Sequence, residues 1–399
     1  MIFFKLPKWD YWTLFILIST AIIIVLSPAD RKAHAGMRSS EQNGLYGTNW
    51  WQKYWENRPN HFGGCGEQTP DDEQIPDDNP NQDQNSDQNS NDLTDTETDA
   101  DSAAETASDQ TESDTTDTYL VAPCTEYTAG TQLGTLFTGP SEISGIVASR
   151  EQADVLWIHQ DSGNTPVLYA IRPDGTSLGQ WNIKADFRIY DWEDIAIEPI
   201  ESGPDLIWVG DIGNNAARDS DIGKARESIR IARLAEPVID QAQAPMSGTV
   251  KTQDSFEFTY PDRPHDAEVL AVDPTTGDMY IFTKEEKAPV YVFRARKPFE
   301  NSTLELVATL DGQQFEWLNS ADFSPNGNEL IIRNYYSASY WERSTGREWE
   351  VVLTEEPANV KLQKEPAGES IGFALDASGF YTVSEGEKVP IWFYQKKCN

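Results

Sequence analysis

Five short segments of similar composition recur along the chain, and they constrain its fold more than any other feature. They read SGIVASR, EDIAIEP, EVLAVDP, NSADFSP and ESIGFAL, and their first residues are Ser144, Glu193, Glu268, Asn319 and Glu369. The intervals are 49, 75, 51 and 50 residues, so a period near fifty is interrupted by a single insertion. A strand-rich repeat of this length is typical of a radial arrangement of β-sheets.

Further strand-type runs follow each recurring segment. The first unit continues with VLWIHQ and PVLYAIR, and the first four units add a fourth, less regular run such as LGQWNI or LELVATL. Four antiparallel strands per unit predict an all-β propeller with five blades. Six blades remain an alternative because of the long second interval, although residues 236–248 (EPVIDQAQAPMSG) lack the β-branched and aromatic density of a strand.

The fifth unit ends after its third run, so a strand from elsewhere must complete it. Residues 132–139 (QLGTLFTG), which precede the first unit, can supply this outer strand and close the ring. The closure would bring Cys124 and Cys398 near each other, because each lies a few residues outside the joined strands. We therefore predict a disulfide between them, with two unpaired thiols as the alternative.

The region before the repeats predicts export and a tether. Residues 1–36 contain an uncharged apolar run, 11–26, flanked by Lys5 and Lys8, which is typical of a membrane anchor. The sequence Ala33-His34-Ala35 resembles a cleavage site, so secretion after cleavage near Ala35 is the alternative. Both versions place residues 119–399, the propeller, outside the cytoplasm, in the bacterial cell envelope or beyond it.

Two segments separate the anchor from the propeller. Residues 37–65 carry an aromatic cluster, NWWQKYW, that suits the membrane interface, and they end at Cys65, where a lipid attachment is a minor alternative. Residues 66–118 consist almost entirely of acidic, amide, hydroxyl and proline residues. Such a composition cannot offset the entropy cost of ordering, so a disordered acidic linker is expected.

The formal net charge of −35 narrows the choice of partners. An acidic surface repels the phosphate backbone, so nucleic acid is not expected to bind. The expected partners are the membrane, through the N-terminal helix, and an unidentified protein or small-molecule ligand.

Propeller geometry gathers polar residues at one end of the ring, which we call the mouth. The first strand of each unit begins there and the second strand ends there, so ten matching positions become neighbours. The strand starts are Ser144, Glu193, Glu268, Asn319 and Glu369, and the strand ends are Asp161, Asp211, Lys284, Arg333 and Glu385. Acids at these positions can bind a ligand, or they can accept backbone N–H groups that join neighbouring units.

Calcium is the cofactor that such a mouth suggests. Calcium prefers six to eight oxygen ligands. The loop DIGNNAARDSD offers Asp211, Asn214, Asn215, Asp219 and Asp221 as a weak candidate site, since it departs from the usual calcium-loop pattern. Zinc is not expected, because His159 and His265, the two histidines of the propeller region, lack paired spacing.

A catalytic role would depend on the same acids. Glu193, Asp211 and Glu268 are the candidates for an acid and nucleophile pair. No G-x-S-x-G elbow, P-loop or H-E-x-x-H motif is present. His159 lies close to Asp161 in WIHQDSGN, but a histidine in a strand is more often packed than catalytic.

The motifs DWEDIAIEP, WVGDIGNN and ESIGFALDASGFYTVSEG, taken with ADFSPNG, resemble a family of exported bacterial β-propellers that is distantly similar to phytase-like propellers. The resemblance implies an exported propeller. Phytase-like propellers hold calcium in acidic loops and bridge substrate phosphates with it, whereas this mouth offers only Lys284 and Arg333 as cations. We therefore predict a membrane-tethered binding module, with a calcium-assisted hydrolase of phosphoesters or glycosides as the alternative.

Overall fold

The computed structural model describes residues 126–161, 163 and 165–397. These residues lie within one compact unit, Gln110–Asn399. The predicted anchor, aromatic segment and acidic linker, together with Cys65, Cys124 and Cys398, lie outside the described residues. The expectations that concern them stay predictions.

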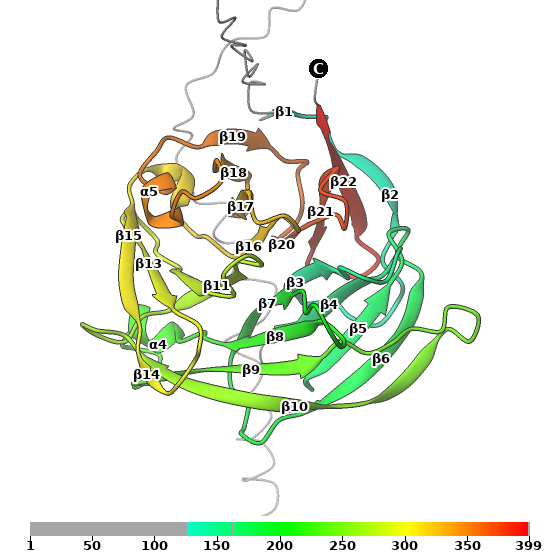
Figure 1. The fold of residues 1–399 in the computed structure, drawn as a ribbon, viewed down its shortest axis with the longest axis horizontal. Coiled ribbons are helices and arrows are strands. Elements are labelled where there is room, and N and C mark those ends of the chain that lie inside the picture. Colours follow the sequence, from blue (N-terminus) through cyan, green and yellow to red (C-terminus); the bar gives the residue numbers. More distant parts are fainter. Residues whose placement is uncertain (1–125, 162, 164, 398–399) are drawn as a thin grey trace, which may run out of the picture. The chain divides into compact units, whose positions relative to one another are not determined.

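The strands form an all-β, propeller-like fold of four-stranded antiparallel groups (Figure 1). The first group contains β3 (Ile143–Ala148), β4 (Leu156–Gln160), β5 (Val167–Ile171) and β6 (Ser177–Lys184). The second contains β7 (Trp192–Glu198), β8 (Leu206–Asp211), β9 (Ile229–Ala235) and β10 (Met246–Thr259). The third contains β11 (Ala267–Val272), β12 (Met279–Thr283), β13 (Val290–Ala295) and β15 (Glu305–Leu310).

Two more groups complete the described fold. One contains β16 (Ser320–Phe323), β17 (Glu329–Arg333), β18 (Ser337–Glu342) and β19 (Ala358–Lys361). The other contains β20 (Gly368–Phe373), β21 (Gly379–Ser384), β22 (Pro390–Lys397) and β2 (Thr131–Thr135). The inner strands β3, β7, β11, β16 and β20 contact one another in turn, and β20 also contacts β3, so the groups surround a common centre (Figure 1).

Two short strands and three helical turns of the described chain lie outside the four-stranded groups. The strands β1 (Glu126–Tyr127) and β14 (Ser302–Thr303) add to the edges of β22 and β10. The helical turns are α4 (Asn215–Arg218), η1 (Gln313–Phe315) and α5 (Trp349–Val352). Within the part of the chain that the structure describes, no helix has the length and apolar character needed to span a membrane.

The last group is closed by a strand from the start of the described chain, as predicted. Strand β2 pairs antiparallel with β22, with Thr131 opposite Phe393 and Thr135 opposite Pro390. The strand is shorter than the predicted 132–139. Strand β1 extends the same pairing and places Glu126 opposite Lys397. The two ends of the described fold are thus hydrogen-bonded to each other.

Strand β10 is much longer than the short fourth run expected for its unit, because it spans Met246–Thr259. Its first half, Met246 to Lys251, pairs parallel with β6, and its second half pairs antiparallel with β9. The stretch 236–248 was expected to lack a strand, which is wrong for its last three residues. Gly179 permits this pairing, because a Cβ at that position, where φ is 146°, would collide with the Met246 carbonyl. A strand specified by long-range pairing leaves little signal in its own composition.

The core lies between the groups. Inner strands such as β3 and β7 are buried along their whole length, because both of their faces contact a neighbouring group. Val147 and Trp157 of the first group, for example, pack in one cluster with Ile195 and Val209 of the second. Burial on both faces explains why the inner strands do not alternate between apolar and polar residues in the sequence.

Candidate functional site

Three carboxylates of the mouth come together at the junction of the first two groups. Asp161 follows β4, Asp191 precedes β7, and Glu193 is the second residue of that strand. One side-chain oxygen from each residue lies within 4.8 Å of those of the other two. We call these residues the carboxylate triad. Asp161 and Glu193 were predicted mouth residues, whereas Asp191 was not, although it stands in the conspicuous run DWED.

The backbone positions the triad firmly. The Asp161 N–H donates to the Glu142 carbonyl at 2.8 Å. The Asp191 N–H donates to the Asp211 carboxylate at 2.8 Å. The Ser144 hydroxyl donates to the Glu193 carbonyl at 2.5 Å, which joins the first two groups. The triad is therefore fixed by both groups, as a preformed ion site requires.

The electrostatic environment of Glu193 is strongly unfavourable to its own charge. Its exposed fraction is 3%. Burial raises the pKa of Glu193 well above its ordinary value, and the negative charges of Asp161, Glu268, Asp191 and Asp266 raise it further. A cation bound among these oxygens would reverse the effect, because an opposite charge favours the ionised form.

The loop after β8 covers the triad, and it needs a glycine to do so. A Cβ at Gly213 would collide with Oε1 of Glu193 and lie 2.6 Å from Oδ2 of Asp191. Arg226 holds the loop down, since its guanidinium donates to the Gly213 carbonyl and, at 3.0 Å, to the Asp211 carboxylate. The sequence prediction did not include Arg226, which has no fixed spacing from the residues that it contacts.

The predicted metal loop does not gather its oxygens around one point. Asp211 accepts the N–H groups of Tyr190 and Asp191 and pairs with Arg226. Asn214 exchanges hydrogen bonds with the Arg226 backbone at 2.9 and 3.0 Å. Asn215 accepts from Arg218, and Asp219 accepts the Asp221 N–H at 3.0 Å. These groups shape the loop itself, so among the described acids the cluster able to hold a metal is the triad.

The other acids of the mouth include one that forms an ion pair and two that form none with any of the described residues. Lys284 forms an ion pair with Glu268 and donates to the Tyr335 hydroxyl at 2.9 Å. Burial raises the pKa of Glu268, and the positive charge of Lys284 opposes that rise. Burial, with the adjacent Glu385 charge, raises the pKa of Glu369 to about 8. The pKa of Glu385 is raised to about 7, again chiefly by burial.

Two other predicted mouth residues serve to connect the groups. The Asn319 amide donates to the Gly368 carbonyl at 3.0 Å. Arg333 is fully buried, donates to the Ser370 carbonyl at 3.0 Å, and pairs with Glu365 at 2.9 Å. The charge of Arg333 is therefore directed to Glu365, an acid outside the ten predicted mouth positions.

The two histidines are packed residues. His159 is fully buried and stacks on Trp192 with the ring centroids 4.0 Å apart. Burial lowers the pKa of His159 to about 3, so the ring is neutral at physiological pH. His265 is also buried and lies 3.1 Å from Asp262. Neither histidine belongs to the acidic group that the described residues bring together.

A buried arginine crosses the opposite end of the ring. Arg150 follows β3 and donates to the Phe373 carbonyl at 3.2 Å and the Phe323 carbonyl at 3.1 Å. It also pairs with Asp322 at 2.9 Å. Asp322 in turn accepts the Phe373 N–H at 2.8 Å. One side chain thus joins the first group to the fourth and fifth, and no local feature of the sequence predicted this contact.

Comparisons with known proteins assign the chain to no family. No family model matches it, and no curated protein matches it. Among solved structures, a gluconolactonase from Xanthomonas campestris is similar at 11% identity with a TM-score of 0.39. That similarity covers 69% of this chain and 99% of the gluconolactonase. The resemblance to exported bacterial propellers stays a prediction.

Proposed function

We propose that this protein is a five-bladed, membrane-tethered propeller whose acidic mouth binds a divalent cation, with calcium as the first choice, and through it an oxygen-rich ligand. The observation that carries this proposal is the carboxylate triad, whose oxygens lie within 4.8 Å of one another around the buried Glu193. Three mutually repelling carboxylates, one of them buried and two partly exposed, are a suitable arrangement for sharing a cation.

The donor set fits calcium better than the other common protein metals. All three ligands are hard carboxylate oxygens, and calcium accepts six to eight such oxygens in flexible geometries. Three residues do not fill that number, so waters or ligand oxygens would complete it. The proposed binding function depends on the remaining coordination positions of the cation, since a sugar hydroxyl or an acid group can replace a water there.

Calcium is expected to stabilise the folded protein. The full chain, stripped with a chelator, should show a higher thermal midpoint in millimolar calcium, because a ligand at about 100 times its Kd adds about 2.7 kcal/mol. The shift should amount to a few degrees for a protein of this size. Thermal unfolding followed by circular dichroism measures it.

Matched variants locate the site. Asp161→Asn and Glu193→Gln should abolish the calcium shift, whereas Asp219→Asn should keep it, because Asp219 is exposed and its carboxylate bonds within its own loop. The proposal fails if calcium leaves the midpoint of the full chain unchanged, or if Asp219→Asn removes the shift as completely as Glu193→Gln.

The second candidate function is a cation-assisted hydrolase. The raised pKa values of two acids in the mouth favour it. Glu369 and Glu385, with pKa values of about 8 and about 7, can hold a proton at neutral pH in the same mouth. A protonated carboxyl is the general acid that cleavage of a glycoside or phosphoester requires. Of the predicted catalytic residues, Glu193 and Glu268 remain candidates, while Asp211 is engaged by Arg226.

An activity screen separates the two functions. We expect a hydrolase to cleave a nitrophenyl glycoside or phosphate in the presence of calcium, and Glu193→Gln and Glu369→Gln to reduce that rate at least a hundredfold. Glu387→Gln, an exposed change in the neighbouring loop, is the control. A protein that binds calcium but cleaves neither substrate class is a binding module.

The proposed location rests on the sequence alone. We propose that residues 1–36 anchor the protein and that residues 66–118 hold the propeller away from the membrane. The full chain should then remain in the membrane fraction after carbonate extraction and be digested by protease added outside the cell. A soluble, processed form that begins near Ala35 would indicate the cleaved alternative.

A further inference from the structure

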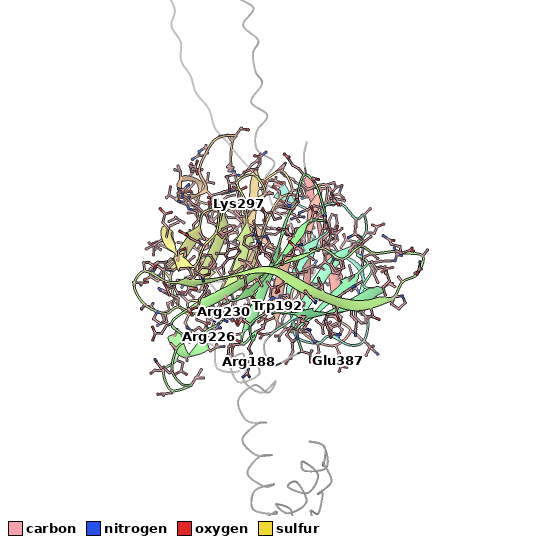
Figure 2. All side chains as sticks on the ribbon, turned by 60° about the horizontal axis from the view of Figure 1, so that its bottom comes forward. Arg188, Trp192, Arg226, Arg230, Lys297 and Glu387 are labelled. Atoms are coloured by element: carbon pink, nitrogen blue, oxygen red, sulfur yellow. The ribbon has the colours of Figure 1, made fainter. Side chains whose placement is uncertain are left out.

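The segment between β6 and β7, which leads to Asp191 of the triad, presents a cation and an aromatic ring to the surface. Its residues alternate, so that Phe187 and Ile189 pack on the core while Arg188 and Tyr190 are exposed. Tyr190 is 56% exposed, an unusual position for a large aromatic side chain in this fold. In Figure 2, Arg188 lies at the lower edge of the molecule between Arg226 and Glu387.

Tyr190 lies against two guanidinium groups that differ in their contacts. The Arg188 guanidinium carbon is 4.8 Å from the centre of the Tyr190 ring, and that of Arg226 is 5.9 Å away. Arg226 is committed to the Asp211 carboxylate and the Gly213 carbonyl. Arg188 forms no ion pair with any of the described residues, whereas Arg218 pairs with Asp266 and Arg333 pairs with Glu365. Arg188 is therefore a cation held in place by a ring rather than neutralised by an acid.

The same segment leads directly into the triad. The backbone N–H groups of Tyr190 and Asp191 share one oxygen of Asp211, at 3.2 and 2.8 Å. Asp191 is a triad member, so Arg188, which lies against the Tyr190 ring, precedes a residue of the proposed cation site by three positions. An anion is repelled by the surface of a chain with net charge −35, and this combination of a bound cation and a guanidinium offers it a place to bind.

We propose that Arg188 is the anion-recognition residue of the mouth and that the ligand carries an acid group, a carboxylate or a phosphate, shared between the triad cation and Arg188. Tyr190 is the positioning residue. A guanidinium donates two parallel hydrogen bonds to either acid group, and a hard cation binds the same oxygens. This inference rests on the proposed cation site and names the chemistry of the ligand.

The test uses three sugars that differ in one group. Titration calorimetry of the calcium-saturated full chain with glucuronate, glucose 6-phosphate and glucose should show binding of at least one of the two acids, tighter than that of glucose. Arg188→Gln should weaken the binding of that acid about tenfold or more, as expected for the loss of a charge-assisted pair. The two acids distinguish a carboxylate ligand from a phosphate ligand.

Further variants separate binding from positioning. Tyr190→Phe should retain the affinity of the wild type and Tyr190→Leu should lower it a few-fold, because the ring and not the hydroxyl holds Arg188. Lys251→Gln on β10 removes an exposed positive charge elsewhere and should have no effect. Lost affinity in this control would reveal a general charge effect and overturn the assignment.

The calcium-induced thermal shift distinguishes failure of the Arg188 assignment from failure of the proposed cation site. Arg188→Gln should keep the full calcium-induced thermal shift, since Arg188 is not a triad ligand. Absence of that shift in the wild-type protein would reject the cation site itself. A normal calcium shift, combined with no binding of either acid or with equal binding by Arg188→Gln, would reject only the role of Arg188.

Discussion

Replacement of Arg150 by alanine should lower the free energy of unfolding by about 3–5 kcal/mol, because removing one partner of a buried ion pair leaves the other charge unpaired. Arg150 and Asp322 are each only 5% exposed at their side chains. Arg150 also satisfies the carbonyls of Phe323 and Phe373, which belong to inner strands of two other groups. Its loss would therefore remove contacts that hold the ends of β3, β16 and β20 together.

Urea denaturation measures this effect, and two variants test its cause. Arg296→Ala should change stability by less than about 0.5 kcal/mol, because its side chain is 60% exposed and contributes only weak surface pairs. The double variant Arg150→Met with Asp322→Asn should recover part of the loss, since no buried charge remains. Equal stability of Arg150→Ala and Arg296→Ala would show that the contacts of Arg150 do not stabilise the packing of the groups.

Stability in the absence of calcium is expected to fall as the pH rises from 5 to 8. The pKa of Glu369 is raised by burial to about 8, against an ordinary value near 4.5. Over this range the folded state retains a proton that the unfolded state releases, so the contribution is fully present at low pH and is lost as the pH passes through 8. The slope is up to about 1.4 kcal/mol per pH unit for each such carboxyl.

Unfolding by urea at pH 5, 6, 7 and 8 measures this slope. Glu369→Gln should flatten it, because an amide does not titrate, whereas the exposed Glu387→Gln should leave it unchanged. Glu193 and Glu385 add to the slope in both variants, since their pKa values are also raised. A stability that increases toward pH 8, or an equal slope in Glu369→Gln, would contradict a buried, protonated Glu369.

Much of the fold was accessible from the sequence. The apolar runs that begin near Ser144, Glu193, Glu268, Asn319 and Glu369 are inner strands, and the strand before the first unit pairs with β22. Both predictions succeeded because strand periodicity and repeat spacing are local properties that each unit carries by itself. The predicted mouth residues likewise followed from antiparallel pairing, which places Trp192 opposite Asp211 and Ser320 opposite Arg333.

The set of acids that come together in the triad was not accessible in the same way. Spacing made Asp211 and Asn214 look equivalent to the triad residues, but Arg226 and backbone N–H groups engage one carboxylate oxygen of Asp211, and the Arg226 N–H engages the side-chain oxygen of Asn214. Asp191 instead joins Asp161 and Glu193. Whether a carboxylate is satisfied depends on donors that arrive from distant parts of the chain, and no local pattern encodes them.

The sequence by itself determined the repeating strands, their order, and the end of the ring at which polar residues collect, since these depend on hydrophobic periodicity along the chain. The tertiary structure alone decided which charges are paired. It sends Arg150 across the ring to Asp322, turns Arg333 toward Glu365, and leaves Arg188 on a tyrosine ring. The physical reason is that ion pairing and desolvation depend on distances in space between residues that lie far apart in sequence.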